Sequence, residues 1–207
     1  MEACRTILES GLAALNLPHT PEQIDQLLAF IKLIAKWNKA YNLTAVRNNE
    51  DMARLHILDS LAILPHIEGK RVIDIGTGAG LPGIPLAIFL PEVEFVLLDS
   101  NAKKTRFVQQ VILELKLKNV SVIHSRAEDY QPEQGFDTVT TRAFASLPDM
   151  VKMTAHLLSP NGVLLAMKGQ IPEAELAEMN THTTLIKINV PEVEAERCLV
   201  RLSPKLG

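Results

Sequence analysis

The sequence has 207 residues, of which 47% are hydrophobic and 22% charged, a balance typical of a globular protein rather than a disordered chain. Its 24 Asp and Glu residues outnumber 21 Lys and Arg residues, and the net charge of −3 excludes the overall basic excess of proteins that coat nucleic acid, but not a local basic face. The two cysteines, Cys4 and Cys198, belong to no CxxC or Cys/His pattern, so we expect neither a disulfide framework nor a metal site.

The sequence also lacks the pattern of an exported or membrane-inserted chain. No long apolar stretch of the signal-peptide type follows residues 1–5, and no apolar run reaches the ~18 residues needed to span a bilayer. We therefore expect a cytoplasmic protein that does not enter a membrane, and we expect it to be a monomer.

The first third of the chain has the pattern of helices. Thr20, Pro21 and Gln23 form an expected capping box with proline at the first helical position. Apolar residues then recur every three or four positions, at Ile24, Leu27, Leu28, Ile31, Ile34 and Ala35, and again at Met52, Leu55, Leu58, Leu61 and Ala62. We expect residues 1–69 to form an N-terminal helical extension packed on the domain that follows.

From residue 70 onward, short β-rich runs alternate with stretches of helical length. The expected strands are 71–75, 95–98, 120–124, 136–141 and 162–167, and the expected helices are 81–90, 102–116 and 146–158. Residues 183–190 and 197–203 have no helix between them and should pair antiparallel. Residues 70–207 are thus predicted to be one α/β domain, a doubly wound Rossmann-like sheet with antiparallel C-terminal edge strands.

A glycine-rich loop follows the first expected strand. Gly76, Gly78 and Gly80 lie between that strand and a helix, where glycine allows positive φ and close approach of a ligand. Two cofactor classes use such a loop, the pyrophosphate of a dinucleotide and S-adenosylmethionine (SAM).

Nearby carboxylates favour SAM. We expect Asp74, two residues before Gly76, to face the ammonium group of the methionine moiety, a placement poorly suited to a pyrophosphate. Asp99 ends the second strand, where it can accept hydrogen bonds from ribose hydroxyls of either cofactor. Because residues 78–83 also satisfy GxGxxG, a weak motif by itself, a dinucleotide site stays open.

Two further loops are predicted to complete the cofactor site. The loop 125–129 follows the third strand, and its backbone at Ala127 and Glu128, or a carboxylate, can meet the adenine edge. Arg142 and Phe144 follow the fourth strand, at the edge where open α/β sheets bind ligands.

The chain as a whole resembles a known family. The resemblance rests on residues 36–44 (KWNKAYNLT), 56–60 (HILDS), 74–85, 98–100, 142–145 (RAFA) and 168–169, which occur in this order. They are similar to the RsmG (GidB) family, bacterial small-subunit methyltransferases that modify guanine N7 in the 530 loop of 16S rRNA. The resemblance implies SAM as the methyl donor, with contacts at Gly76, Leu81, Ala127, Glu128 and Arg142.

Two positions depart from the pattern of that family. Leu55 stands before His56 where a basic residue is usual, with Arg54 one position earlier, and this moves the charge around the helix. Lys103-Lys104 replaces a common Lys-Arg, which keeps the charge but loses the bidentate fork of arginine. Both departures concern contacts to RNA and leave the predicted cofactor site unchanged.

The implied chemistry needs alignment rather than a base. Guanine N7 carries a lone pair and no proton, so we predict no catalytic residue and no metal. We interpret His56 as a packing residue and leave open a contact with RNA or cofactor. Candidate RNA contacts are Lys32, Lys36, Lys39, Lys103, Lys104, Arg106, Arg142 and Lys168, with Trp37, Tyr41 or Phe144 for stacking.

Several alternatives stay open at this point. We interpret Trp37 as a core residue, and the lysines either bind RNA or form a solvated face. The resemblance implies 16S rRNA as the partner. A modest basic patch on an acidic protein predicts weak affinity for naked RNA and dependence on the small subunit or an assembly intermediate. A dinucleotide-binding oxidoreductase, a non-catalytic SAM-binding module, and a SAM enzyme acting on a protein or small molecule are the competing functions.

Overall fold

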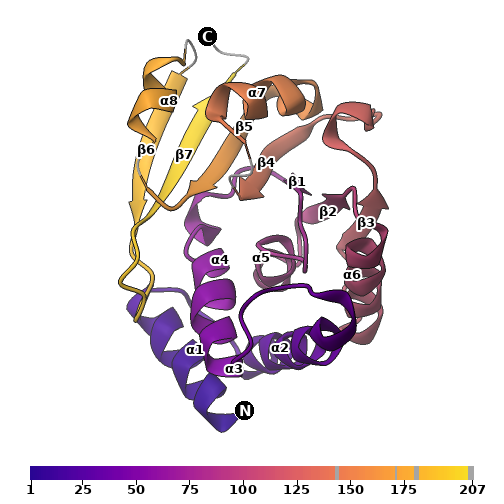
Figure 1. The fold of residues 1–207 in the computed structure, drawn as a ribbon, viewed down its shortest axis with the longest axis vertical. Coiled ribbons are helices and arrows are strands. Elements are labelled where there is room, and N and C mark those ends of the chain that lie inside the picture. The colour runs from indigo at the N-terminus through magenta and orange to yellow at the C-terminus, as the bar shows by residue number, and fades with distance from the viewer. Residues whose placement is uncertain (143–144, 171, 180–181, 205–207) are drawn as a thin grey trace.

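The computed structural model describes residues 1–142, 145–170, 172–179 and 182–204. Within them, seven strands form one sheet in the order β3-β2-β1-β4-β5-β7-β6 (Figure 1). The strands are β1 (Arg71–Ile75), β2 (Glu94–Asp99), β3 (Val120–His124), β4 (Phe136–Arg142), β5 (Leu158–Lys168), β6 (His182–Ile188) and β7 (Arg197–Ser203). The pairs among β1 to β5 are parallel, and β7 is antiparallel to β5 and β6. The expected doubly wound sheet with an antiparallel edge is confirmed.

The order of the strands locates a ligand site before any side chain is considered. The chain runs outward from β1 to β3 on one side and from β4 to β5 on the other, so the winding reverses between β1 and β4. Open α/β sheets bind ligands at the carboxyl ends of the strands beside such a reversal. The ligand site is therefore expected at the loops that follow β1 and β4.

Helices cover both faces of the sheet. The helices that follow β1 are α5 (Gly83–Phe89), α6 (Ala102–Glu114), α7 (Leu147–Thr154) and α8 (Glu173–Ala177). Short 3-10 turns are η2 (Leu64–His66), just before β1, and η3 (Ala127–Asp129) and η4 (Ala155–Leu157) after it. Successive residues of a strand point to opposite faces. Accordingly Val72 packs with α5 and α6, whereas Ile73 packs with α7.

The sequence placed most element bounds closely, with two informative differences. The expected helix 81–90 begins only at Gly83, because residues 77–82 form the turn that carries the glycine loop. The expected strand 162–167 begins earlier, at Leu158, which pairs with Phe136 across a register shift in β4.

The N-terminal helices share a core with the sheet. α1 spans Glu2–Ala14 and α2 spans Pro21–Tyr41. The expected capping box is present, with hydrogen bonds of 2.9 and 3.2 Å between Thr20 and Gln23. The apolar stripe of α2 is buried, apart from the half-buried Ala35, in the same cluster as Val72. Because the core is continuous, the division of the chain at residues 69 and 70 stays a prediction.

The second N-terminal helical run contains an irregular turn that the sequence did not reveal. α3 (Asn49–Met52) continues into a π-helical turn, η1 (Ala53–Leu58), and then into α4 (Asp59–Leu61). The hydroxyl group of Ser60 donates a 2.6 Å hydrogen bond to the carbonyl oxygen of His56. Such wide turns occur frequently at functional sites. This one carries His56 and leads directly to Asp59.

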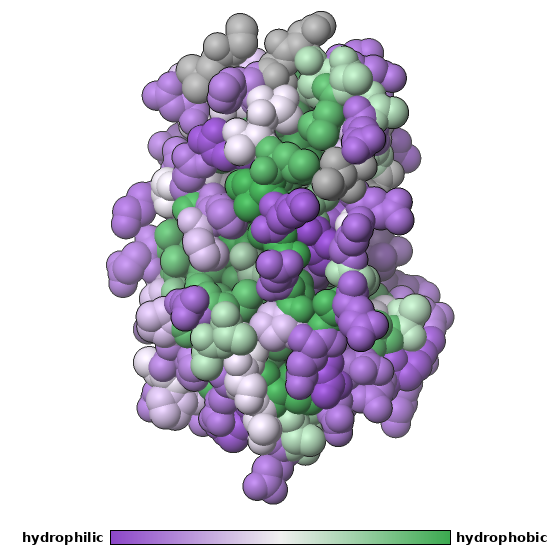
Figure 2. Space-filling model, turned by 90° about the vertical axis from the view of Figure 1, so that its left-hand side faces the viewer, coloured by the Kyte–Doolittle hydropathy of each residue, from purple (hydrophilic) through white to green (hydrophobic). Residues whose placement is uncertain are grey.

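The surface on the β6 side is mixed in character. Figure 2 shows hydrophobic residues gathered in an irregular band down the middle of this face, with hydrophilic residues on both sides. Leu185 on β6 is one of three exposed large hydrophobic residues in the described chain, with Met1 and Leu113. Among the described residues, no helix is long and apolar enough to cross a membrane. Cys4 and Cys198 are buried free thiols.

Close packing between α1 and η1 gives a test of the fold. A Cβ atom at Gly11 would lie 2.3 Å from a methyl carbon of the buried Leu58. We expect Gly11→Ala to lower the free energy of unfolding by about 1–3 kcal/mol through overpacking, although alanine is the better helix former. Urea denaturation measures this. The exposed neighbour Ser10→Ala should change it by less than about 0.5 kcal/mol, and a Gly11→Ala variant as stable as wild type would contradict the packing.

Candidate active site

The glycine loop after β1 adopts the backbone conformation that its sequence predicts. Gly76 has φ of +65° and Gly80 has φ of +93°, values that side chains disfavour. The backbone N–H groups of Gly80 and Leu81 both donate to the carbonyl oxygen of Thr77, at 2.9 and 3.0 Å. The loop is therefore a tight hydrogen-bonded turn that ends at the start of α5.

Asp74 does not face a ligand, and this prediction was wrong. Its carboxylate is completely buried, where it accepts hydrogen bonds from the hydroxyl of Thr77 (2.7 Å), the N–H of Gly83 (3.0 Å) and the hydroxyl of Thr140 (3.0 Å). Burial raises the pKa of Asp74 to about 7, against the lowering effect of these hydrogen bonds and of Arg142. In β1 the side chain of position 74 points to the α5 face rather than to the sheet edge. Asp74 thus fastens the loop to β4 and α5.

Asp99, at the end of β2, holds the loop from the other side. One carboxylate oxygen accepts the N–H of Gly78 at 2.9 Å, and the other accepts the N–H of Asn101 at 2.8 Å. A carboxylate offers about four acceptor positions, so capacity remains for hydroxyl donors. Asp99 also lines a cavity, in agreement with a role beyond the loop.

That first cavity, of about 360 Å³, lies at the carboxyl ends of β1 to β4 and is called the donor cleft below. Five of the eight predicted cofactor residues line it: Gly76, Asp99, Ala127, Glu128 and Arg142. The other three do not line it: Gly80 and Leu81 are buried in the turn, and the partly exposed Gly78 donates its N–H to Asp99. Met153, on α7, also lines the cleft, and no sequence pattern marked this residue.

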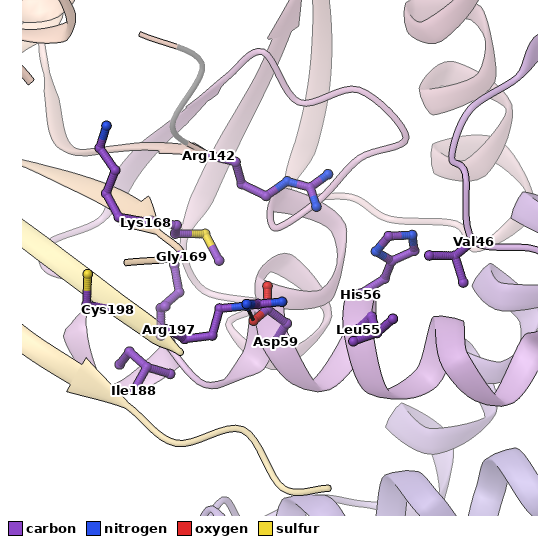
Figure 3. A pocket seen from close by; sticks show the side chains of 12 residues that line it. Val46, Leu55, His56, Asp59, Arg142, Lys168, Gly169, Ile188, Arg197 and Cys198 are labelled. Atoms are coloured by element: carbon purple, nitrogen blue, oxygen red, sulfur yellow. Dashed lines mark hydrogen bonds and ion pairs between the residues drawn. The ribbon is translucent and has the colours of Figure 1, made fainter. Parts of the chain in front are cut away.

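A second cavity, of about 370 Å³, lies between η1, β5 and β7 and is called the acceptor cavity below (Figure 3). His56, Asp59 and Arg197 line one side, and Lys168 and Cys198 the other. Arg142 lines this cavity as well as the donor cleft. Its guanidinium group has no ion-pair partner within 4.0 Å in the described part of the chain. The two cavities therefore meet at Arg142.

Several charged groups of the acceptor cavity already have ion-pair or hydrogen-bond partners within the protein. Lys168 forms a 3.1 Å ion pair with Glu175 and donates to the carbonyl of Ala145 at 3.1 Å. Arg197 forms a 2.9 Å ion pair with Asp59. Sequence reasoning gave no role to Asp59 or Arg197, which are distant along the chain. The only available signal was that Asp59 follows His56 by three residues on a helix, which places both on one face.

His56 is a neutral, largely buried histidine. Burial and, to a lesser extent, the charge of Arg142 lower its pKa to about 4, while the backbone of Leu55 opposes this weakly. Nε2 lies 2.7 Å from the hydroxyl oxygen of Thr44, and Nδ1 is buried without a hydrogen-bond partner of ordinary geometry in the described chain. A base of such low pKa is a poor proton acceptor at pH 7.

The other predicted contacts are distributed over the surface and core. Trp37 is half-buried and packs edge-on against Tyr41 and Phe107, as its interpretation as a core residue requires. The side chains of Lys32, Lys36, Lys39, Lys103 and Arg106 are exposed, and Lys104 is half-exposed. Phe144 lies outside the described residues.

The departure from the family pattern at Leu55 has a structural counterpart. Arg54 pairs with Glu192 at 2.9 Å, in the loop between β6 and β7, so its charge is directed away from the acceptor cavity. Leu55 itself lines that cavity.

The fold is the Rossmann-like fold of SAM-dependent methyltransferases. A SAM-dependent methyltransferase from Aquifex aeolicus matches with a TM-score of 0.56 at 17% identity, covering 73% of this chain and 93% of that one. TYW2 of M. jannaschii, solved in complex with AdoMet, matches with a TM-score of 0.54 at 20% identity, covering 70% and 72%. At these identities the likeness establishes the fold.

Sequence comparison identifies the family. The family model described as "GidB: rRNA small subunit methyltransferase G" matches residues 23–200. Ribosomal RNA small subunit methyltransferase G of Nitrosococcus oceani is 50% identical over 202 residues, covering 96% of this chain and 94% of the relative. The protein of that name from Vibrio cholerae is 50% identical over 209 residues, covering 99% and 100%. The chain belongs to the rRNA small subunit methyltransferase G family, and the resemblance found in the sequence is confirmed.

The role of Asp74 can be tested at its hydrogen bonds. Asp74→Ala leaves three buried donors without an acceptor, so we expect the free energy of unfolding to fall by about 2–4 kcal/mol. Because the glycine loop is released, affinity for SAM should fall at least about tenfold in calorimetric titration. Asp137→Ala is the matched control: it removes the acceptor of the Lys70 and Arg71 N–H groups at the other end of β1. The control should lose stability and keep its SAM affinity; equal affinity losses would contradict the assignment.

The buried state of His56 predicts a pH-dependent stability. Its pKa is about 4 in the folded protein and about 6.5 unfolded, so the unfolded chain binds the proton first as pH falls. The stabilisation is complete above pH 6.5 and is lost between pH 6.5 and 4. Urea denaturation at pH 7.5 and 4.5 should show His56→Gln losing about 2 kcal/mol less on acidification than wild type. The exposed His182→Gln should behave as wild type, and identical losses in all three proteins would refute the prediction.

Proposed function

We propose that this protein transfers the methyl group of SAM to N7 of a guanine in the 530 loop of 16S rRNA. The observation that carries the proposal is that Arg142 borders both cavities at the carboxyl edge of the sheet. One cavity lies beside the glycine loop. The other is lined by apolar and charged side chains and has room for a base. A bound donor and a bound base would then meet beside Arg142.

The residues of the donor cleft suit SAM. Asp99 has acceptor capacity left for ribose hydroxyls, and Glu128 presents a carboxylate on η3 where an adenine amino group can donate to it. The guanidinium group of Arg142 suits a carboxylate such as that of the methionine moiety. Gly78, Gly80 and Leu81 are assigned to holding the loop. Asp99 would suit the ribose of either cofactor, so the choice of SAM over a dinucleotide is supported by the family to which the chain belongs.

The chemistry requires little of the protein beyond alignment. When bound, SAM supplies a methyl group attached to a positively charged sulfur. The N7 lone pair forms the new bond to carbon while the electrons of the carbon–sulfur bond stay on sulfur, so no proton leaves and the base becomes cationic. The neutral His56 agrees with the absence of a general base. The walls of the two cavities hold the reactants in line, an effect that supplies up to ~7–11 kcal/mol in favourable cases.

The phosphates of the ribosomal RNA are held by residues outside these cavities. The exposed lysines of α2 and the basic start of α6 are the candidate phosphate contacts, while Lys168 is already paired with Glu175. Because the net charge is −3, affinity should depend on a structured particle more than on charge alone. We assign the protein to the cytoplasm, as a monomer that uses no metal.

Methyl transfer tests the proposal directly. Small subunits from cells lacking this protein, incubated with labelled SAM and the purified protein, should gain label at one guanine of the 530 loop, detected by strand cleavage specific for 7-methylguanine. Gly76→Asp places a charged side chain at positive φ on the cleft and should lower kcat/KM more than about 100-fold. Asn161→Asp, at an exposed position near the start of β5, should leave it unchanged.

Three outcomes would refute the proposed function. Binding of NADH rather than SAM would indicate an oxidoreductase. Binding of SAM without transfer would indicate a binding module. Label on protein or elsewhere in the RNA would indicate another acceptor.

A further inference from the structure

The acceptor cavity contains a carboxylate, that of Asp59, of which only one oxygen accepts a hydrogen bond from the described part of the protein. Nε of Arg197 donates to Oδ1 of Asp59 at 2.9 Å, and the same guanidinium donates to the carbonyl oxygen of Glu196 at 2.9 Å. No described residue donates to Oδ2 of Asp59, and 11% of the side chain stays exposed to the cavity. Figure 3 shows Asp59 and Arg197 side by side on the cavity floor, with Arg142 above them.

We propose that Asp59 recognises the acceptor guanine by accepting hydrogen bonds from its N1–H and N2–H groups, with Arg197 as the positioning residue that fixes the carboxylate. This inference rests on the proposed function and assigns the acceptor cavity to the base. A volume of about 370 Å³ lies in the range of pockets that take small ligands. A base that is modified must leave its stack and enter such a pocket.

The chemistry of the two edges matches. An ionised carboxylate only accepts hydrogen bonds, and the N1–N2 edge of guanine only donates them. Adenine presents an unprotonated N1 at the same position, so its lone pair would face the carboxylate. A site built to pair with a donor rejects the analogue that lacks it, because the buried acceptor is left unpaired.

The surroundings of Asp59 support a ligand role over a purely structural one. A buried ion pair adds little stability, because removing both charges from water offsets their attraction. Stability alone therefore gives little reason for the Arg197–Asp59 pair. The pair lies on the wall of a cavity that Arg142 also lines. His56, 9% exposed and on the same wall, has a buried Nδ1 without a partner in the described chain. Buried polar groups of this kind are uncommon unless a ligand or water completes them.

The same contact also favours the reaction. Methylation at N7 gives the base a positive charge, which makes N1–H a stronger donor. The hydrogen bond to Asp59 is therefore stronger in the transition state than in the bound substrate, the condition under which binding raises kcat. Apolar walls strengthen this interaction by excluding water, and they come from Val46, Leu55, Ile63, Met167 and Ile188.

The test uses reconstituted small subunits with guanosine or inosine at the target position. Inosine keeps N7 and N1–H but lacks the N2 amino group, so wild type should methylate it with kcat/KM about 10- to 100-fold lower. Asp59→Asn should lower kcat/KM on guanosine by about 10- to 100-fold through kcat, with unchanged SAM affinity, and should discriminate less than about threefold between the two bases. Glu68→Gln is the control: it breaks a comparable 2.8 Å ion pair with Arg201, outside both cavities, and should behave as wild type.

Each outcome decides the question. If wild type methylates inosine as well as guanosine, or if Asp59→Asn keeps the full penalty for inosine, Asp59 does not recognise this edge. Equal rates of wild type on inosine and guanosine overturn the proposal even if Asp59→Asn fails to fold. If wild type methylates neither particle, the proposed function itself fails and this inference fails with it.

Discussion

The buried carboxylate of Asp74 is the interaction on which the donor cleft depends. Three donors from three different segments, the loop, the start of α5 and β4, converge on its two oxygens. A backbone turn with several residues at positive φ has little intrinsic preference for one geometry, so an external acceptor must hold it. Asp74 performs this role from inside the protein, and Asp99 completes it from the cleft side. Both carboxylates hold the turn, and only Asp99 also lines the donor cleft.

The division of labour at the site follows from the reaction. A nucleophile without a proton needs no base, and the cavity walls contain a neutral histidine rather than a titrating one. Under the proposed function, the positive charge that begins on the donor sulfur ends on the acceptor base, so charge would move from one cavity to the other. Arg142, which lines both cavities, and Asp59, which lines the acceptor cavity, are the charged groups that such a transfer would respond to.

Much of the fold was predictable from local patterns. The alternation of short β-rich runs and helical stretches predicted β1, β3 and β7 with their observed bounds, because each run is short and bounded by residues typical of loops or helices. The glycine loop and the cleft residues at the strand ends were likewise accessible, since parallel topology brings those ends together. The prediction that Asp74 faces the ligand was wrong because side chains alternate along a strand, and position 74 points to the α5 face.

The acceptor cavity was less accessible to sequence reasoning. Asp59 and Arg197 come from α4 and β7, 138 residues apart in the chain, and the antiparallel edge of the sheet brings them into contact. Met153 reaches the donor cleft because α7 crosses above the sheet, which no local pattern specifies. The π-helical turn was also invisible, because its residues have an ordinary amphipathic pattern.

That turn has a consequence for how the protein tolerates change in length. A π-helical turn is equivalent to one extra residue within an α-helix, so the parts before and after it are out of phase by about 100°. Deleting a single residue from Ala53–Leu58 would let a regular α-helix form and would leave the orientation of α4 relative to α3 unchanged, because the wide turn absorbs the extra residue. Asp59 would still lie opposite Arg197. A deletion within a regular helix would instead rotate the residues beyond it by about 100°, so this segment tolerates a change in length that a regular helix does not.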